Sequence, residues 1–250
     1  MFSYSCRSII KENFISAFKK LVFNYHPSAL PQGRGGAPIS WQIMNEQKFV
    51  ASTIHQMDKG IDSGPILFQS KKELKLKRPT LLDYDVLISK SCADIFEIFL
   101  KKIKSNQKIK LRKQNENNSS YLPRLHTEVN EAINFDWTNE EIEKFVRAFS
   151  FPYPGAFTFV RKHKIAILDC FIEKSKIKFH PFTNGRVNKK FSDGTVRIVT
   201  KNGFLRISKI RVNNKVMNPS EFLRINDVLF TPHSILDKSR MEIASVKNMK

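Results

Sequence analysis

The stretch VFNYHPSALPQGRGGAP, residues 22–38, joins a short apolar run to a long irregular loop. Val22 to Tyr25 predict a short strand, because β-prone residues are concentrated there. Residues 26–38 contain three prolines and three glycines, which predicts a fixed, tightly turning loop. Asn24 and His26 are two residues apart at the strand end, so their side chains are expected to point to the same side.

The residues on either side of this loop predict alternating helices and strands. Apolar residues recur every three or four positions over 11–21 and 81–103, and a further helix is expected to open after Pro38. Strands are predicted at 49–56 and 66–69, where short apolar runs are bounded by turn residues. Such alternation is typical of an α/β domain. In the helix over 81–103, the residues expected to form the apolar stripe are Val86, Ile95, Phe96, Phe99 and Ile103.

The second half of the chain predicts one helix and many short strands. Thr138 and Glu141 have the spacing of a capping box, so a helix is expected to begin there. Residues 196–200 and 204–207 predict a hairpin around Asn202-Gly203. Several short strands separated by turns favour a small, OB-like β-barrel.

A polar, turn-rich stretch over 104–121 lies between the two halves and predicts a linker. The chain is therefore expected to divide near residue 115. The predicted parts are residues 1–114, residues 115–232 and a loosely held tail over 233–250.

Composition restricts the class of protein. The chain has 250 residues, with 43 Lys and Arg against 23 Asp and Glu and a net charge of +20. It contains no apolar run long enough to span a membrane. Its three cysteines lack the spacing of a disulfide framework or a metal site, which favours a reducing, cytoplasmic location. The basic excess fits either a surface that faces nucleic acid or solvated, Lys-rich faces, and composition leaves both open.

Asn24, His26 and Asp62 are the candidate chemical residues. In a parallel sheet, loops at the carboxyl ends of the strands converge, so the Asp62 loop is expected to meet the strand end that carries Asn24 and His26. An amide, an imidazole and a carboxylate together can move a proton and stabilise an oxyanion. The alternative is structural: Asn24 and His26 would form a strand-end hydrogen-bonding pair, and Asp62 would cap the turn at Gly64-Pro65.

The sequence around these residues resembles a known family. NYHPSALP, RGGAP and TIHQMDKGIDSGP closely resemble the 10-formyltetrahydrofolate-dependent formyltransferases, and they occupy residues 24–31, 34–38 and 53–65. The second half is similar to the C-terminal domain of the methionyl-tRNA and nucleotide-sugar branches. The resemblance implies a partial Rossmann-like formyltransferase domain followed by the small barrel. The matching segments of the second half are 135–137, 147–149, 152–157 and 217–223.

The resemblance also implies roles for individual residues. His26 would be the general acid and base, Asn24 would stabilise the oxyanion, and Asp62 would raise the pKa of His26 and hold it. 10-Formyltetrahydrofolate would be the co-substrate, and no metal is implied. The residues implied to contact the folate are Ser8, Ile9, Ile10, Ser28, Ala29, Leu30, Pro31, Asp58, Lys59, Gly60 and Ile61.

The sequence leaves several roles unassigned. His55 is expected to pack the loop, and Arg34 either meets the acceptor or fixes the glycine-containing loop, with the second favoured. The acceptor is methionyl-tRNA, narrowly preferred, or a nucleotide-linked amino sugar. An inactive fragment that binds RNA is the non-enzymatic alternative.

The family's first domain begins with strands that have no counterpart before Phe2. The resemblance therefore implies an N-terminally truncated domain. An exposed sheet edge would favour self-association of the chain.

Overall fold

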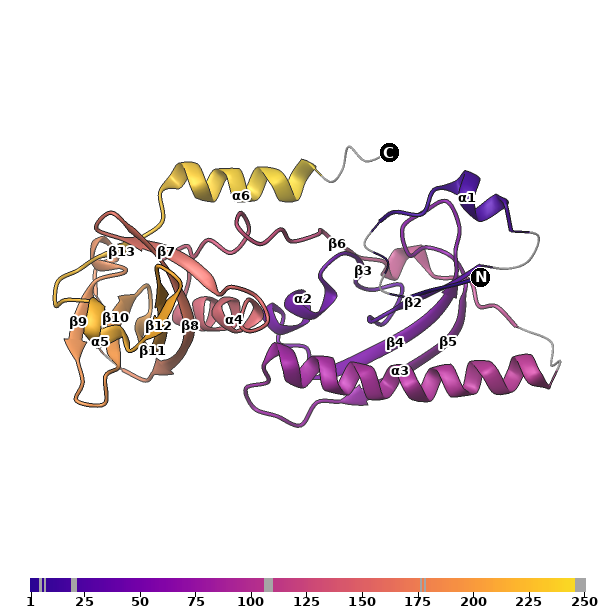
Figure 1. Ribbon diagram of the computed structural model, residues 1–250, viewed down its shortest axis with the longest axis horizontal. Coiled ribbons are helices and arrows are strands. Elements are labelled where there is room, and N and C mark those ends of the chain that lie inside the picture. The colour runs from indigo at the N-terminus through magenta and orange to yellow at the C-terminus, as the bar shows by residue number, and fades with distance from the viewer. Residues whose placement is uncertain are drawn as a thin grey trace. The chain divides into compact units, whose positions relative to one another are not determined.

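The computed structural model describes residues 1–4, 6, 8–18, 22–105, 110–175, 177 and 179–245 (Figure 1). The chain divides into two compact units. The first comprises Met1–Gln42 and Gln47–Arg124, and the second comprises Ile43–Glu46 and Leu125–Lys250. Residues 19–21 of the predicted first helix and 106–109 of the predicted linker lie outside the described residues.

The first unit has the mixed α/β content that the sequence predicts. Its four-stranded sheet has the order β1-β2-β4-β5. Only β1 and β2 pair in parallel, whereas the β2–β4 and β4–β5 pairs are antiparallel. The expected parallel arrangement is wrong for these two pairs. For β4 and β5 the reason is that residues 57–65 join them as a hairpin and are too few for a parallel crossover. The strand bounds are β1 Phe2–Tyr4, β2 Phe23–His26, β4 Phe49–Gln56 and β5 Ile66–Glu73.

The helices of this part are α1 Glu12–Ser16, α2 Pro38–Met44 and α3 Leu81–Lys104. Helix α3 begins at a capping box formed by Thr80 and Asp83, and it packs on β4 and β5. Its predicted apolar stripe is partly wrong, since Val86 and Ile103 are 54% and 49% exposed. The buried face follows a different set of residues, namely Leu81, Tyr84, Ile88, Ser91, Ile95 and Phe99.

Residues 110–124 are attached to the first unit by backbone pairing. Arg112 forms an antiparallel bridge with Ile66, and the amide and carbonyl of each bond to the other at 2.8 Å. Strand β6 (Tyr121–Leu122) pairs in parallel with β3 (Arg34–Gly35). Between Arg112 and β6 lies the short 3-10 helix η1 (Glu116–Asn118). The described part of the predicted linker is therefore integrated into the first unit.

The second unit combines one long sheet with helix α4 (Asn139–Ala148). The predicted capping box of Thr138 and Glu141 is confirmed at the start of α4, and the predicted hairpin is confirmed as β10 and β11. The sheet has the order β13-β7-β8-β11-β10-β9, with β12 paired to β11. The strand bounds are β7 Ala156–Val160, β8 His163–Glu173, β9 Val187–Lys190, β10 Val196–Thr200, β11 Gly203–Val212, β12 Lys215–Met217 and β13 Leu229–Phe230. Shorter helical segments are η2 Pro181–Thr183 and α5 Pro219–Phe222.

This sheet curls so that its two ends meet. The Val187 amide donates to the Asp227 carbonyl at 2.8 Å, and the Leu229 amide donates to the Gly185 carbonyl at 2.9 Å. These bonds satisfy backbone groups that an open sheet edge would leave unpaired.

Residues 233–245 of the tail that is expected to be loosely held form helix α6 (His233–Ser245), and residues 246–250 lie outside the described residues. Leu236 is buried in a cluster with Ala132 and Phe157. The Asn130 side chain donates to the Ser239 carbonyl at 3.0 Å. An apolar anchor and a polar one thus attach α6 to the second unit. Among the described helices, none is both long and apolar enough to cross a bilayer.

Glu131 is a buried carboxyl group in the second unit. It is 1% exposed, and its Oε1 atom has no hydrogen-bond partner. Burial raises the pKa of Glu131 to about 7, with Glu128 adding to the shift and Lys164 opposing it. Glu131 is therefore more easily protonated in the folded chain than in the unfolded one.

We expect Glu131→Gln to stabilise the protein at pH 8 and to change its stability little at pH 5. In the wild type, the protonated carboxyl stabilises the fold fully below the ordinary pKa of 4.5, and this contribution is lost as the pH rises through about 7. Removing the buried charge should raise the free energy of unfolding at pH 8 by about 1–3 kcal/mol. Thermal unfolding at the two pH values measures the difference. Glu73→Gln, at an exposed carboxyl on β5, is the control, and an equal shift at both pH values would contradict the argument.

Candidate active site

The structure brings Asn24, His26 and Asp62 together. Strand β2 presents Asn24 and His26, and the loop between β4 and β5 carries Asp62. The His26 Nδ1 atom lies 3.5 Å from Asp62 Oδ2, and the Asn24 Nδ2 atom lies 3.4 Å from Asp62 Oδ1. These side chains meet for a different reason from the one expected. Strand β4 runs antiparallel to β2, so the loop between β4 and β5 must extend back along β2 to bring Asp62 to Asn24 and His26.

The Asp62 carboxylate is held in an ionised state. The Gly35 amide donates to Oδ2 at 2.9 Å. Although burial opposes ionisation, His55, His26 and the Gly35 amide lower the pKa of Asp62 to about 2. Gly35 has φ of +97°, and a Cβ there would collide with the Leu122 carbonyl oxygen, so this donor position requires glycine.

His26 is buried, and its pKa is lower than the ordinary value. Burial lowers the pKa, while the charge of Asp62 and the Gly33 carbonyl raise it. Asp62 does raise the pKa of His26, as expected, but the opposing effect of burial is larger. The His26 Nε2 atom lies 2.7 Å from the Gly33 carbonyl oxygen, which assigns the hydrogen of the neutral ring to Nε2. Nδ1, on the side of Asp62, is then the proton acceptor.

His55 is a fourth member of this cluster, and sequence reasoning assigned it only to packing. Its Nε2 atom lies 3.3 Å from Asn24 Nδ2 and 3.4 Å from Asp62 Oδ1. Its Nδ1 atom lies 2.9 Å from the Gln56 carbonyl. The feature that identifies His55 as a member of the cluster is the pairing of β2 with β4, which sets Asn24 opposite His55. This pairing cannot be recognised from the sequence of either strand alone.

Arg34 and Gln114 connect the glycine-containing loop to the Asp62 loop. Arg34 Nη2 donates to Gln114 Oε1 at 2.8 Å. Gln114 Nε2 donates to the carbonyls of Asp62 and Gly64 at 2.8 and 2.7 Å. Arg34 also forms a bidentate ion pair with Glu116, at 2.9 and 2.8 Å. Arg34 thus fixes the loop, as favoured from sequence, but sequence reasoning missed Gln114.

We expect Gln114→Ala to lower kcat/KM for formyl transfer by about 10- to 100-fold, because a small displacement of a catalytic group is costly. Without Gln114, the buried carbonyls of Asp62 and Gly64 lose their donor, and the carboxylate loses its fixed position. Steady-state kinetics measure the effect. Asn117→Ala, in the exposed helix η1, is the matched control. Wild-type kinetics for Gln114→Ala would remove this positioning role.

The residues implied to contact folate fall into three segments. Ser8 and Ile9 are exposed and Ile10 is half-buried, between β1 and α1. Ser28, Ala29 and Leu30 are buried and Pro31 is half-buried. Asp58, Lys59, Gly60 and Ile61 are exposed in the loop that ends at Asp62. In the described part of the chain, no hydrogen bond or ion pair joins Ser8, Ile9 or Ile10 to the acid–base cluster.

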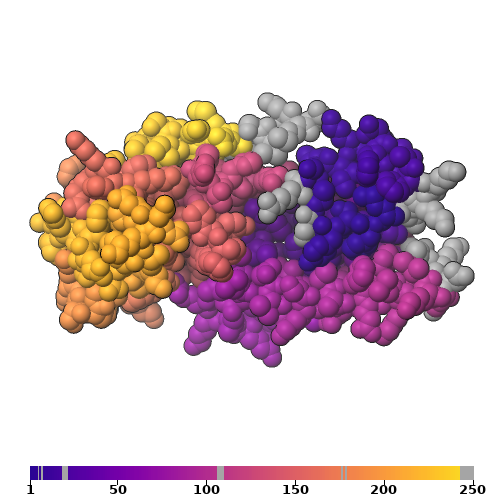
Figure 2. Space-filling model, viewed as in Figure 1, coloured from indigo at the N-terminus to yellow at the C-terminus, as the bar shows by residue number. Residues whose placement is uncertain are grey.

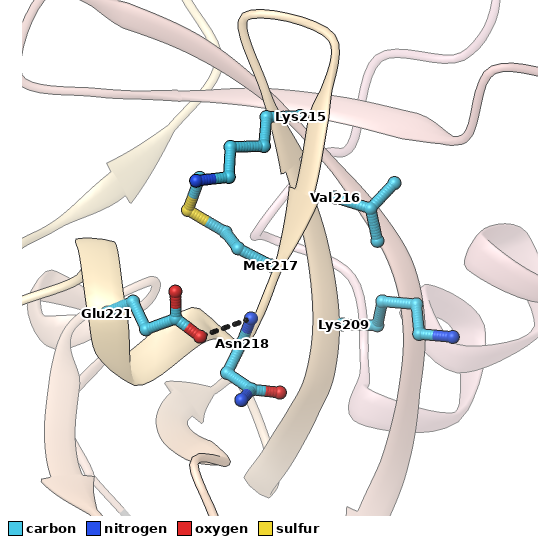
Figure 3. A pocket seen from close by; sticks show the side chains of 6 residues that line it. All are labelled: Lys209, Lys215, Val216, Met217, Asn218 and Glu221. Atoms are coloured by element: carbon cyan, nitrogen blue, oxygen red, sulfur yellow. Dashed lines mark hydrogen bonds between the residues drawn. The ribbon is translucent and has the colours of Figure 1, made fainter.

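The described residues contain no group of three or more His, Cys, Asp or Glu able to hold a metal ion. A cavity of about 320 Å³ in the second unit is bordered by β11, β12 and α5 (Figure 3). None of the predicted site residues lines this cavity; its lining residues are Lys209, Lys215, Val216, Met217, Asn218 and Glu221.

Comparison with known proteins places this chain in a family. Residues 2–80 match the family model "Formyl transferase", and residues 127–227 match "Formyl transferase, C-terminal domain". The chain is 30% identical over 223 residues to the methionyl-tRNA formyltransferase of Clostridium tetani, covering 88% of this chain and 69% of that protein. The fold and the matches define a one-carbon transferase. The chain belongs to the formyltransferase family.

Two solved structures are also similar. The N-formyltransferase from Helicobacter canadensis, in complex with folinic acid and dTDP-3-aminofucose, is 27% identical. The match has a TM-score of 0.62 and covers 82% of this chain and 71% of that one. HypX from Aquifex aeolicus, in complex with tetrahydrofolic acid, has a TM-score of 0.59 and is 16% identical, which shows the fold alone. The match covers 88% of this chain, which spans 37% of the length of HypX.

Proposed function

We propose that the chain transfers the formyl group of 10-formyltetrahydrofolate to a primary amine, that of methionyl-tRNA. The observation that carries this proposal is the cluster of buried His26 with half-buried Asn24 and Asp62, at hydrogen-bonding or ion-pair separations in a chain of the formyltransferase family. Its amide, imidazole and carboxylate are the groups that acyl transfer to an amine requires without a covalent enzyme intermediate.

The proposal gives each of these residues a step. The acceptor amine forms a C–N bond to the formyl carbon, and His26 Nδ1 takes the proton that the amine must lose. Asp62 stabilises the imidazolium that results. Asn24 Nδ2 donates to the oxygen on which negative charge develops. His26 then gives its proton to N10 of the folate as the bond from the formyl carbon to N10 breaks.

The residues implied to contact folate fit a flat donor of mixed polarity. Asp58 accepts hydrogen bonds from the Gly60 amide at 3.0 Å and the Ser63 hydroxyl at 2.8 Å, and so shapes the exposed loop before Asp62. Ile9 and Ile61 expose apolar side chains, at 56% and 36%. A pterin ring binds where backbone polar groups accompany apolar walls. The folinic acid bound to the Helicobacter enzyme supports this assignment.

The acceptor is argued from similarity and charge. The curated relative is a methionyl-tRNA formyltransferase, and the net charge of +20 suits a polyanionic acceptor such as tRNA, although it does not separate tRNA from a negatively charged nucleotide-sugar. A nucleotide-linked amino sugar is the second candidate, supported by the dTDP-3-aminofucose of the Helicobacter complex. We further propose that the curled sheet of the second unit is the OB-like barrel expected from sequence, and that the enzyme is cytoplasmic.

A formyl-transfer assay tests the proposal directly. The chain is incubated with 10-formyltetrahydrofolate and, in parallel, with methionyl-tRNA and several nucleotide-linked amino sugars. Transfer to methionyl-tRNA that is abolished in His26→Ala supports the proposal, and transfer to a sugar alone selects the second candidate. Salt-sensitive RNA binding without transfer to any acceptor would instead support a non-enzymatic RNA-binding protein.

A further inference from the structure

Helix α3 carries a second apolar stripe that its own unit leaves largely uncovered, although one stripe residue, Phe96, packs its ring on Phe2 of β1 at 5.1 Å. Four large side chains on this stripe are 42–54% exposed, and two small residues, Ser89 and Ala93, lie between them. These six residues and half-buried Phe96 are spaced alternately four and three residues apart over the whole helix. The stripe comprises Leu82, Val86, Ser89, Ala93, Phe96, Leu100 and Ile103. Figure 2 shows the magenta segment of α3 on the molecular surface.

This spacing is the repeat by which two helices pack along a common seam. A helix that only covers a sheet needs one apolar face, and α3 already has one on β4 and β5. Ser89 and Ala93 at the centre of the stripe would allow two backbones to approach closely. The larger side chains toward both ends would then pack against one another.

Charges beside the stripe specify how a partner helix would run. Each charge directly follows a stripe residue, and the signs alternate in steps of seven residues: Asp83, Lys90, Glu97 and Lys104. If a second copy of α3 runs antiparallel about an axis near Ala93, Asp83 faces Lys104 of the other copy and Lys90 faces Glu97. All four contacts then join opposite charges. Antiparallel helices also align their macrodipoles favourably.

We propose that α3 is a self-association surface and that two copies of this chain pair through it as an antiparallel helical dimer. The charge pattern makes a second copy the best occupant, because the sequence of one α3 complements itself when reversed. The Asp83 carboxylate also accepts a hydrogen bond from the Thr80 amide at the helix cap, at 2.8 Å. Glu97 forms an ion pair with Lys101 of the same helix, at 2.6 Å. These local contacts are exposed or at the helix end, so they leave the apolar seam intact.

Sedimentation of the full chain over a range of concentrations tests the dimer. The wild type is expected to dimerise, and Val86→Glu combined with Leu100→Glu should raise the dimer Kd by at least about tenfold, because burying an unpaired charge at the seam is costly. Ile98→Glu is the matched control, since Ile98 is 48% exposed on the same helix but lies off the stripe. It should leave the dimer unchanged. Circular dichroism verifies that each variant is folded.

A charge exchange provides an independent readout. Lys90→Glu should weaken the dimer, and adding Glu97→Lys to the same chain should restore it, because the opposite-charge contacts return with their signs reversed. A wild-type chain that stays monomeric overturns the proposal. So does a dimer that survives the Val86 and Leu100 substitutions, including one that forms through the edge strand β1, as the sheet-edge expectation implies.

Discussion

Replacing His26 with alanine should lower kcat/KM for formyl transfer by about 100-fold or more, the size expected when a general acid and base is lost. The substitution removes Nδ1, which faces Asp62 at 3.5 Å, so the attacking amine loses its proton acceptor. Asn24→Ala should have an effect of similar size, since removing one donor from a developing oxyanion costs about 3 kcal/mol in comparable sites.

Exposed His126 provides the control, and His126→Ala should retain wild-type kinetics. The pH profile of kcat/KM gives a second test. Burial lowers the pKa of His26 below 6.5, so the midpoint of the acid limb of the wild-type profile should lie below that pH. Full activity in His26→Ala or Asn24→Ala would refute the assignment of these residues.

Replacing Asp62 with asparagine should reduce kcat/KM by about 100-fold, by removing the charge that stabilises protonated His26. The same change should move the acid limb of the pH profile to lower pH. The reason for this direction is that the carboxylate raises the pKa of His26, and its loss leaves burial, the Gly33 carbonyl and His55 acting on the ring. A purely structural role for Asp62 would reduce activity without moving the limb.

Asp85→Asn, at an exposed position on α3, is the matched control and should change neither quantity. Stability gives a further signature. Because the pKa of Asp62 is lowered to about 2, the stability it contributes is complete above its ordinary value of 3.8 and is lost as the pH falls toward 2. The stability difference between wild type and Asp62→Asn should therefore shrink below pH 3.8.

Local sequence signals predicted much of the fold. The capping box at Thr138, the hairpin at Asn202-Gly203 and the strand over 49–56 are set by neighbouring residues, and all three are confirmed. The direction of β4 relative to β2 depends on long-range pairing, which an alternation of helices and strands does not encode. The buried face of α3 was misjudged for a related reason: the helix carries two apolar stripes, and only packing decides which one is covered.

The site shows the same division. Asn24, His26 and Asp62 could be proposed from residue type and resemblance. His55 joins them only through the pairing of two strands, and Gln114 only because a distant polar segment returns to the Asp62 loop. The net pKa shift of His26 also required the structure, since burial and the charge of Asp62 act in opposite directions and only their geometry decides which is larger.

The attachment of residues 110–124 determines where this chain can be recombined with its relatives. A junction at residue 115 would remove Ser120. Its hydroxyl accepts a hydrogen bond from the Gly33 amide and its carbonyl accepts one from the Arg34 amide, both at 2.9 Å. It would also remove β6, and with it the partner strand of the glycine-containing loop. A chimaera joined after Arg124 keeps these bonds. The polar segment thus belongs with the chemistry, and exchange of the second unit among family members should begin beyond it.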